Sequence, residues 1–211
     1  MDMLLRNVTM PEVADLFRKH AELTAAPYLR DAKAIARAKR LARKNGVWDD
    51  LSENLDPTRD IPVVKRSDYR NYKRVGDRTV PQQKAGYRRG ELSRAAMALW
   101  LGHPKADVDY LQDILWAYCD DWTWVMAAHE GRAIDLGSAS RAASFAEMLH
   151  VLGDRIEKEV SDRMHEAIDR EIFQKYWNYR HLDHWKTVRM NWNHVCNGEV
   201  IRAALYQIDD P

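Results

Sequence analysis

Residues 91–118 read ELSRAAMALWLGHPKADVDYLQDILWAY and form the clearest helix–turn–helix pattern in the chain. The first half carries alanine and leucine at helical spacing and ends at Gly102, and glycine commonly closes helices. After the His103-Pro104 turn, apolar residues recur every three or four positions. The pattern predicts helices over 91–101 and 106–118, joined as an antiparallel hairpin.

The same pattern returns further along the chain. Helices are predicted over 138–152, again closed by a glycine, and over 156–177, where apolar residues are spaced by four. The helix ends ALWLG at 98–102, MLHVLG at 148–153 and ALYQID at 204–209 align, which indicates a repeat of roughly fifty residues. We therefore expect an all-α fold, an incomplete α/α toroid or solenoid built from antiparallel helical hairpins. Asp209-Asp210-Pro211 predicts the start of a further helix, so the last hairpin is expected to be truncated.

The N-terminal part has a different character. Glu22–Lys44 predicts a basic helix that ends at Asn45-Gly46, whereas 47–88 has little helical pattern. We expect an irregular segment there, with an extended stretch or short strand at 61–64. The division is then 1–88, N-terminal helices and a basic irregular segment, and 89–211, helical repeats, within one structural domain.

The irregular segment is rich in cations. Ten arginines and lysines, among them Arg70 and Arg74, stand against three aspartates between 59 and 89, with tyrosines interleaved. A solvated linker explains this composition, and so does an electropositive, aromatic wall for an anionic polymer. Nucleic acid would fit the same wall. The formal net charge of +1, however, argues against a nucleic-acid partner recognised through overall charge.

Composition excludes several other classes. No apolar segment approaches membrane-spanning length, so we expect a soluble protein with no membrane partner. Cys119 and Cys196 have neither the spacing of a metal site nor the number of a disulfide framework, and both suit buried packing. We expect no metal and no cofactor.

A polar stretch near the C-terminus, Asn191–Gly198, reads NWNHVCNG and precedes an apolar run that begins at Val200. Asparagine is a poor helix former, so this stretch is expected to lie just before a helix, at its N-terminus. Free backbone N–H groups there favour an anion. Asn191 and Asn197 equally suit caps and loop bridges.

This stretch, together with DWTWVMAAHEGRAIDLGSAS at 121–140, resembles the helical domain of heparinase II/III-type polysaccharide lyases. The resemblance covers roughly residues 90–211. It implies an incomplete α/α toroid, which family members continue into further hairpins and a β-sandwich domain that this chain lacks. It also implies β-elimination next to a uronic acid.

The resemblance assigns roles to two residues. Asn193 would neutralise the sugar carboxylate, and His194 would remove the proton at C5. The tyrosine that protonates the leaving oxygen would lie beyond Pro211. His194 would equally fit a surface side chain, and Glu199 departs from the small residue that the family pattern favours.

Other side chains are candidates for substrate contact. We expect Trp124 to face the groove and Trp192 to lie in the core, with His129 beside the groove. His181 and His184 lack a convincing third metal ligand. The predicted substrate-binding residues are His129, Trp124, Asn191, Asn197, Tyr179, Arg70 and Arg74.

The function expected from the sequence is the substrate-groove part of a polysaccharide lyase, inactive as this fragment. Its partners would be an anionic polysaccharide and the missing β-sandwich domain. The sequence leaves the localisation open: a periplasmic or secreted parent would fit, but the N-terminus lacks the apolar stretch of a signal peptide. The alternative is a non-catalytic helical-repeat module that binds an acidic glycan or a protein.

Overall fold

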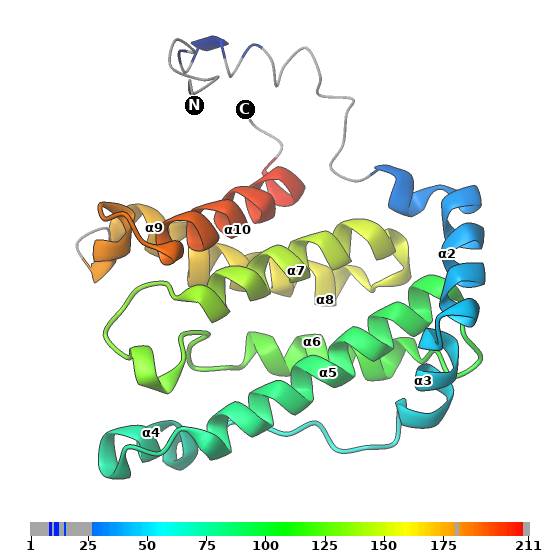
Figure 1. The fold of residues 1–211 in the computed structure, drawn as a ribbon, viewed down its shortest axis with the longest axis horizontal. Helices are drawn as coiled ribbons and strands as arrows, with labels where there is room; N and C mark the ends of the chain where they lie inside the picture. Colours follow the sequence, from blue (N-terminus) through cyan, green and yellow to red (C-terminus); the bar gives the residue numbers. More distant parts are fainter. Residues whose placement is uncertain (1–8, 10, 13–14, 16–26, 180–181, 209–211) are drawn as a thin grey trace.

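A computed structural model describes residues 9, 11–12, 15, 27–179 and 182–208, and these residues form helices and loops without a β-strand (Figure 1). The fold is all-α, as the periodicity predicts. The longer helices are α2 (Ala32–Lys44), α3 (Val47–Asn54), α4 (Arg66–Val75), α5 (Thr79–Leu101), α6 (Val108–Cys119), α7 (Leu136–Leu152), α8 (Lys158–Ile168) and α10 (Asn191–Gln207). Shorter helical pieces are η1 (Pro27–Arg30), η2 (Ala127–His129), η3 (Gly153–Arg155), the π-helical turn η4 (Asp169–Phe173), α9 (Gln174–Asn178) and η6 (His184–Lys186).

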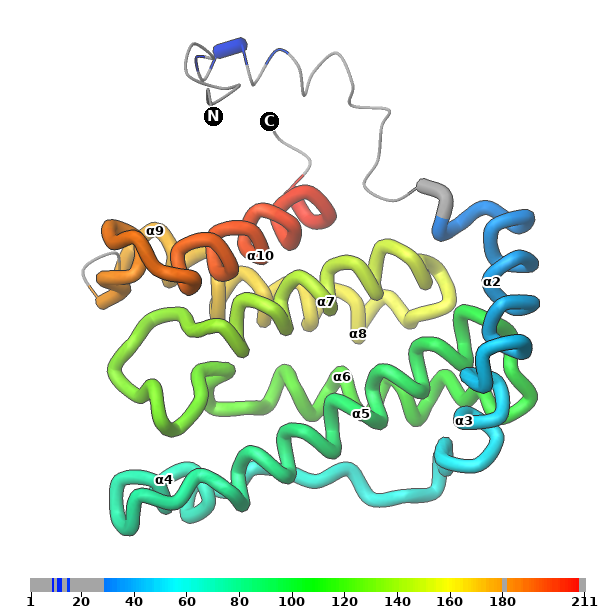
Figure 2. Tube along the Cα trace, viewed as in Figure 1, coloured from blue at the N-terminus to red at the C-terminus, as the bar shows by residue number. Residues whose placement is uncertain are grey.

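The helices pack around one hydrophobic core. α6 lies against both α5 and α8, α7 lies along α10, and α2 and α3 cover one end of α5 (Figure 2). Fully buried apolar side chains from the successive helices fill the space between them, including Leu111, Ile114, Leu115, Phe145, Met164 and Ile168. Both cysteine thiols are buried. A closed toroid or a solenoid stays a prediction.

The turn between α5 and α6 follows the sequence pattern closely. Gly102 ends α5 in the left-handed conformation, with φ of 62°, which glycine adopts without a steric penalty. Asp107 then begins α6 by accepting a hydrogen bond from the backbone N–H of Tyr110, at 2.9 Å. The predicted helix boundaries at 101 and near 106 are therefore confirmed to within two residues.

The prediction of an irregular segment over 47–88 is wrong. This region contains α3, α4 and the first half of α5, and 61–64 is not a strand. Charged residues cover most of these helices and hide their periodicity in the sequence. Leu51 and Tyr69 are buried, so tertiary packing stabilises helices that the sequence pattern does not predict. The proposed boundary at residue 88 falls within α5, which runs unbroken across it.

Asn191–Gly198 lies at the N-terminus of a helix, as expected, but it forms the first two turns of α10 instead of preceding the helix. The low helix propensity of asparagine is overcome by packing against α7 and by side-chain hydrogen bonds to neighbouring segments. The helix starts expected at Glu22 and at Asp209 both lie outside the described residues.

Replacing Gly102 with alanine should lower the free energy of unfolding by about 1–2 kcal/mol, because a Cβ is strained at positive φ. Gly86→Ala provides the matched control. Gly86 lies inside α5, has no positive φ and has no atom within 4 Å of an added Cβ, so alanine should raise stability by about 1 kcal/mol. Urea denaturation followed by circular dichroism checks both, and equal effects would contradict the assigned helix end.

Candidate ligand-binding cleft

A cleft of about 970 Å³ lies between α4 and α5 on one side and α7 and the start of α10 on the other. Its walls are the start of α4, the N-terminal half of α5, the loop over 121–128, and the first turns of α7 and α10. Apolar side chains make up much of the lining, and polar groups are spread among them. A large concave site with an apolar interior and a few placed polar groups is the usual form of a ligand site.

The cleft carries an excess of positive charge. Lys65, Arg66, Arg78 and Arg89 line it, are exposed, and make no ion pair with any residue in the part of the chain that the structure describes. Of the lining residues, Asp121 is the only carboxylate, and buried Arg88 pairs with it. The guanidinium of Arg88 also lies 3.9 Å from the ring centre of Tyr118. The rim of the cleft is therefore positively charged.

Arg70 lies in the cleft but is already paired. Its Nη1 atom is 2.9 Å from Oε1 of Glu130, and Nζ of Lys73 is 2.9 Å from the other oxygen. Lys73 and Arg70 hold the pKa of Glu130 below its usual range. Arg74, the other arginine of α4 that is predicted to bind substrate, is exposed but does not line the cleft.

Four aromatic residues line the cleft, Tyr69, Tyr118, Trp122 and Phe145, and of these Trp122 alone is exposed. Trp122 is 69% exposed and meets Tyr69 edge-on, with the ring centres 5.0 Å apart. Burial, together with the charges of Glu130 and Asp135, raises the pKa of Tyr69 to about 12, so its phenol is protonated at neutral pH. An exposed tryptophan of this kind offers a flat apolar face to a ligand.

Trp124 does not face the groove, and the prediction is wrong for this residue. Its side chain is completely buried, and its indole N–H donates to the carbonyl of Tyr118 at 3.0 Å. Trp192, predicted as core, is only partly buried and packs against His129. Neither the spacing nor the composition of the loop distinguishes the exposed Trp122 from the buried Trp124.

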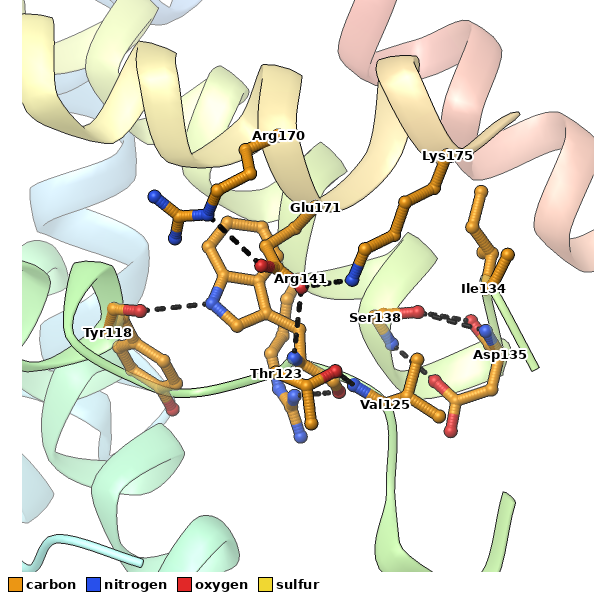
Figure 3. Close-up of polar contacts among 12 residues, drawn as sticks. Tyr118, Thr123, Val125, Ile134, Asp135, Ser138, Arg141, Arg170, Glu171 and Lys175 are labelled. Carbon is orange, nitrogen blue, oxygen red and sulfur yellow. Dashed lines mark hydrogen bonds and ion pairs between the residues drawn. The ribbon is translucent and has the colours of Figure 1, made fainter. Parts of the chain in front are cut away.

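The backbone around Trp124 is fixed by charged side chains from other helices (Figure 3). Glu171, on the π-helical turn η4, accepts a hydrogen bond from the Trp124 N–H at 3.3 Å and pairs with Lys175 at 2.6 Å. Arg141 of α7 donates to the Trp124 carbonyl. These bonds set the path of the loop and thereby the position of Trp122.

His129 is held at the edge of the cleft by Asp135. Its Nδ1 atom is 2.7 Å from Oδ2 of Asp135, and its ring centre is 4.8 Å from that of Trp192. Since a carboxylate accepts the Nδ1 proton, the neutral ring keeps Nε2 as an acceptor. Ala128 and Asn191, adjacent in sequence to His129 and Trp192, line the cleft.

Asn193 and Asn197 form an internal network. The Asn193 amide donates to the carbonyls of Trp185 and Lys186, at 3.0 and 2.9 Å, and its oxygen accepts from the Asn197 amide at 3.3 Å. Asn197 in turn accepts from the Tyr176 hydroxyl at 2.9 Å. Every polar group of the Asn193 amide is thus engaged within the protein.

The first turns of α10 therefore have two sides. Asn191 and Val195 line the cleft, whereas Asn193 and His194 do not, and His194 is exposed. Neither of the two predicted catalytic residues, Asn193 and His194, belongs to the lining of the cationic cleft. Tyr179 is exposed and likewise lies outside the cleft lining.

The loop around η6 is hydrogen-bonded to the segment that leads into α7. Asp183 accepts hydrogen bonds from the N–H groups of Ala133 and Ile134, and the indole of Trp185 donates to the Ile134 carbonyl at 3.2 Å. His181 lies outside the described residues. Within those described, no group of three His, Cys, Asp or Glu side chains is placed to hold a metal ion.

No protein-family model matches the chain, and no curated protein matches it. The resemblance to heparinase II/III-type lyases therefore stays a prediction. Among the described helices, none has the length and apolarity needed to cross a membrane.

Asn193→Ala should lower the free energy of unfolding by about 1–3 kcal/mol, because it leaves two carbonyls and one amide without their partner. His194→Ala, one residue away and exposed, should change it by less than about 0.5 kcal/mol. Thermal and urea denaturation measure both. If Asn193→Ala were as stable as the wild type, the network would not be structural.

Proposed function

We propose that the protein binds an acidic polysaccharide in the cleft between α4, α5, α7 and α10. The observation that carries this proposal is the combination of unpaired cations and an exposed aromatic ring in one cavity. Lys65, Arg66, Arg78 and Arg89 supply charge for carboxylates or sulfates, and Trp122 supplies a flat face for a sugar ring.

Uncharged polar side chains support a carbohydrate ligand. Gln82 and Ser93 of α5 and Ser140 of α7 line the same cleft and suit hydrogen bonds to hydroxyl groups. The apolar lining suits the C–H faces of sugar rings. A cleft of about 970 Å³ can take an oligosaccharide segment.

Of the two functions expected from the sequence, the binding module is the one that the geometry supports. β-Elimination needs a carboxylate-neutralising group and a proton-transfer group at the bound sugar. Asn193 is engaged elsewhere and His194 lies outside the cleft lining, so an elimination activity has no assigned pair in the cleft. The histidine held beside the cleft is His129.

The double variant Arg66→Gln, Arg89→Gln should weaken binding of heparin or polygalacturonate oligosaccharides about tenfold, because two charge contacts of about 0.7 kcal/mol each are lost. Isothermal titration calorimetry at several salt concentrations measures the affinity, which should fall as salt rises. Arg37→Gln, Arg40→Gln on α2 is the matched control, since both are exposed and remote from the cleft lining. An equal loss in the control, or tighter binding of single-stranded DNA than of any uronate polymer, would refute the proposal.

Glu130→Gln should strengthen binding by about three- to tenfold, because it removes a negative charge beside the cleft and releases Arg70. Glu53→Gln, an exposed glutamate on α3 outside the cleft, is the control and should leave affinity unchanged. The same titrations measure the effect. Weaker binding by Glu130→Gln would mean that Arg70 works only when Glu130 positions it.

A further inference from the structure

One face of α5 runs along the cleft as a regular stripe. Arg78, Gln82, Gly86, Arg89 and Ser93 all line the cleft and are all exposed. Their spacing of four, four, three and four residues places them on one side of a helix. The stripe therefore presents a cation near each end and small or neutral groups between them.

The middle of the stripe is hollow. Gly86 lies within α5 at negative φ, so its backbone conformation does not require glycine. A Cβ placed there would meet no atom within 4 Å, and the neighbouring lining residue is Ala85. Glycine is the poorest helix former after proline, and it permits close approach of a ligand to the backbone. The wall of the cleft is therefore recessed at Gly86, between Arg78 and Arg89.

Two aromatic side chains line the same cavity as this stripe. Trp122, from the loop, and Tyr69, from α4, face the same cavity and meet at 5.0 Å. Both have their ring positions set by the protein: Tyr69 by burial, and Trp122 by the loop whose backbone Glu171 and Arg141 hold. An extended ligand that follows α5 would pass Gly86 inside the cavity that these rings also line.

We propose that an extended polyanion lies along α5, with anionic groups bound by Arg78 and Arg89. Between these two arginines it crosses the recess at Ala85 and Gly86, which we call the saddle. The two arginines are eleven residues apart, so their Cα atoms are separated by about 16 Å along the helix axis. This inference rests on the proposed function and adds a length requirement to it. A ligand must carry charges far enough apart to meet both cations at once, and a ligand that meets only one loses the advantage of the second contact.

Gly86→Leu tests the saddle. Leucine fills the hollow, and because it is a better helix former than glycine the variant should be at least as stable as the wild type. It should bind a heparin or polygalacturonate hexasaccharide at least tenfold more weakly. Gly198→Leu is the matched control: Gly198 lies within α10, is exposed, has no atom within 4 Å of an added Cβ and does not line the cleft. It should bind like the wild type.

The outcomes separate the two proposals. If the wild type binds none of these polyanions, the proposed function is wrong and the saddle with it. If the wild type binds and Gly86→Leu binds equally well, or if a disaccharide binds as tightly as the hexasaccharide, the cleft is used but the path along α5 is overturned. Circular dichroism melting of both glycine variants shows whether a loss of binding reflects a loss of fold.

Discussion

The buried carboxylate of Asp135 is the interaction on which the site depends. Its oxygens accept hydrogen bonds from the N–H of Ser138, in the first turn of α7, and from the N–H of Met126, and Oδ2 lies 2.7 Å from Nδ1 of His129. A carboxylate with no exposure is tolerated only when its oxygens are bonded in this way. Because the three partners come from the loop, η2 and α7, a single residue connects the loop wall of the cleft to the helices.

The polar residues that are most conspicuous in the sequence serve the scaffold. Asn193 and Asn197 connect α10 to η6 and α9, and the η6 loop in turn holds the segment that leads to Asp135. Hydrogen bonds within such a network strengthen one another, and leaving one half-made is costly. The proposed ligand surface consists instead of exposed residues such as Trp122 and Arg89.

The net charge of +1 conceals how charge is distributed. Carboxylates are used where cations must be neutralised inside or beside the fold, as with Asp121 at Arg88 and Glu130 at Arg70. Arg66, Arg78 and Arg89 at the rim of the cleft form no such pair with any of the residues that the structure describes. A local positive potential can therefore exist in a protein that is nearly neutral overall, and it attracts anions over about one Debye length.

The sequence by itself determined the all-α class and the boundaries near Gly102, because apolar spacing and a helix-ending glycine act locally. It did not reveal the helices in 47–88 or the helical state of Asn191–Gly198, since these depend on long-range packing and on bonds such as Asn193 to η6. Only the tertiary structure decided that Trp124 is buried while Trp122 is exposed, because exposure depends on which neighbours the folded chain brings to each ring. The cationic cleft arises in the same way, from segments that are distant in sequence and adjacent only in the fold.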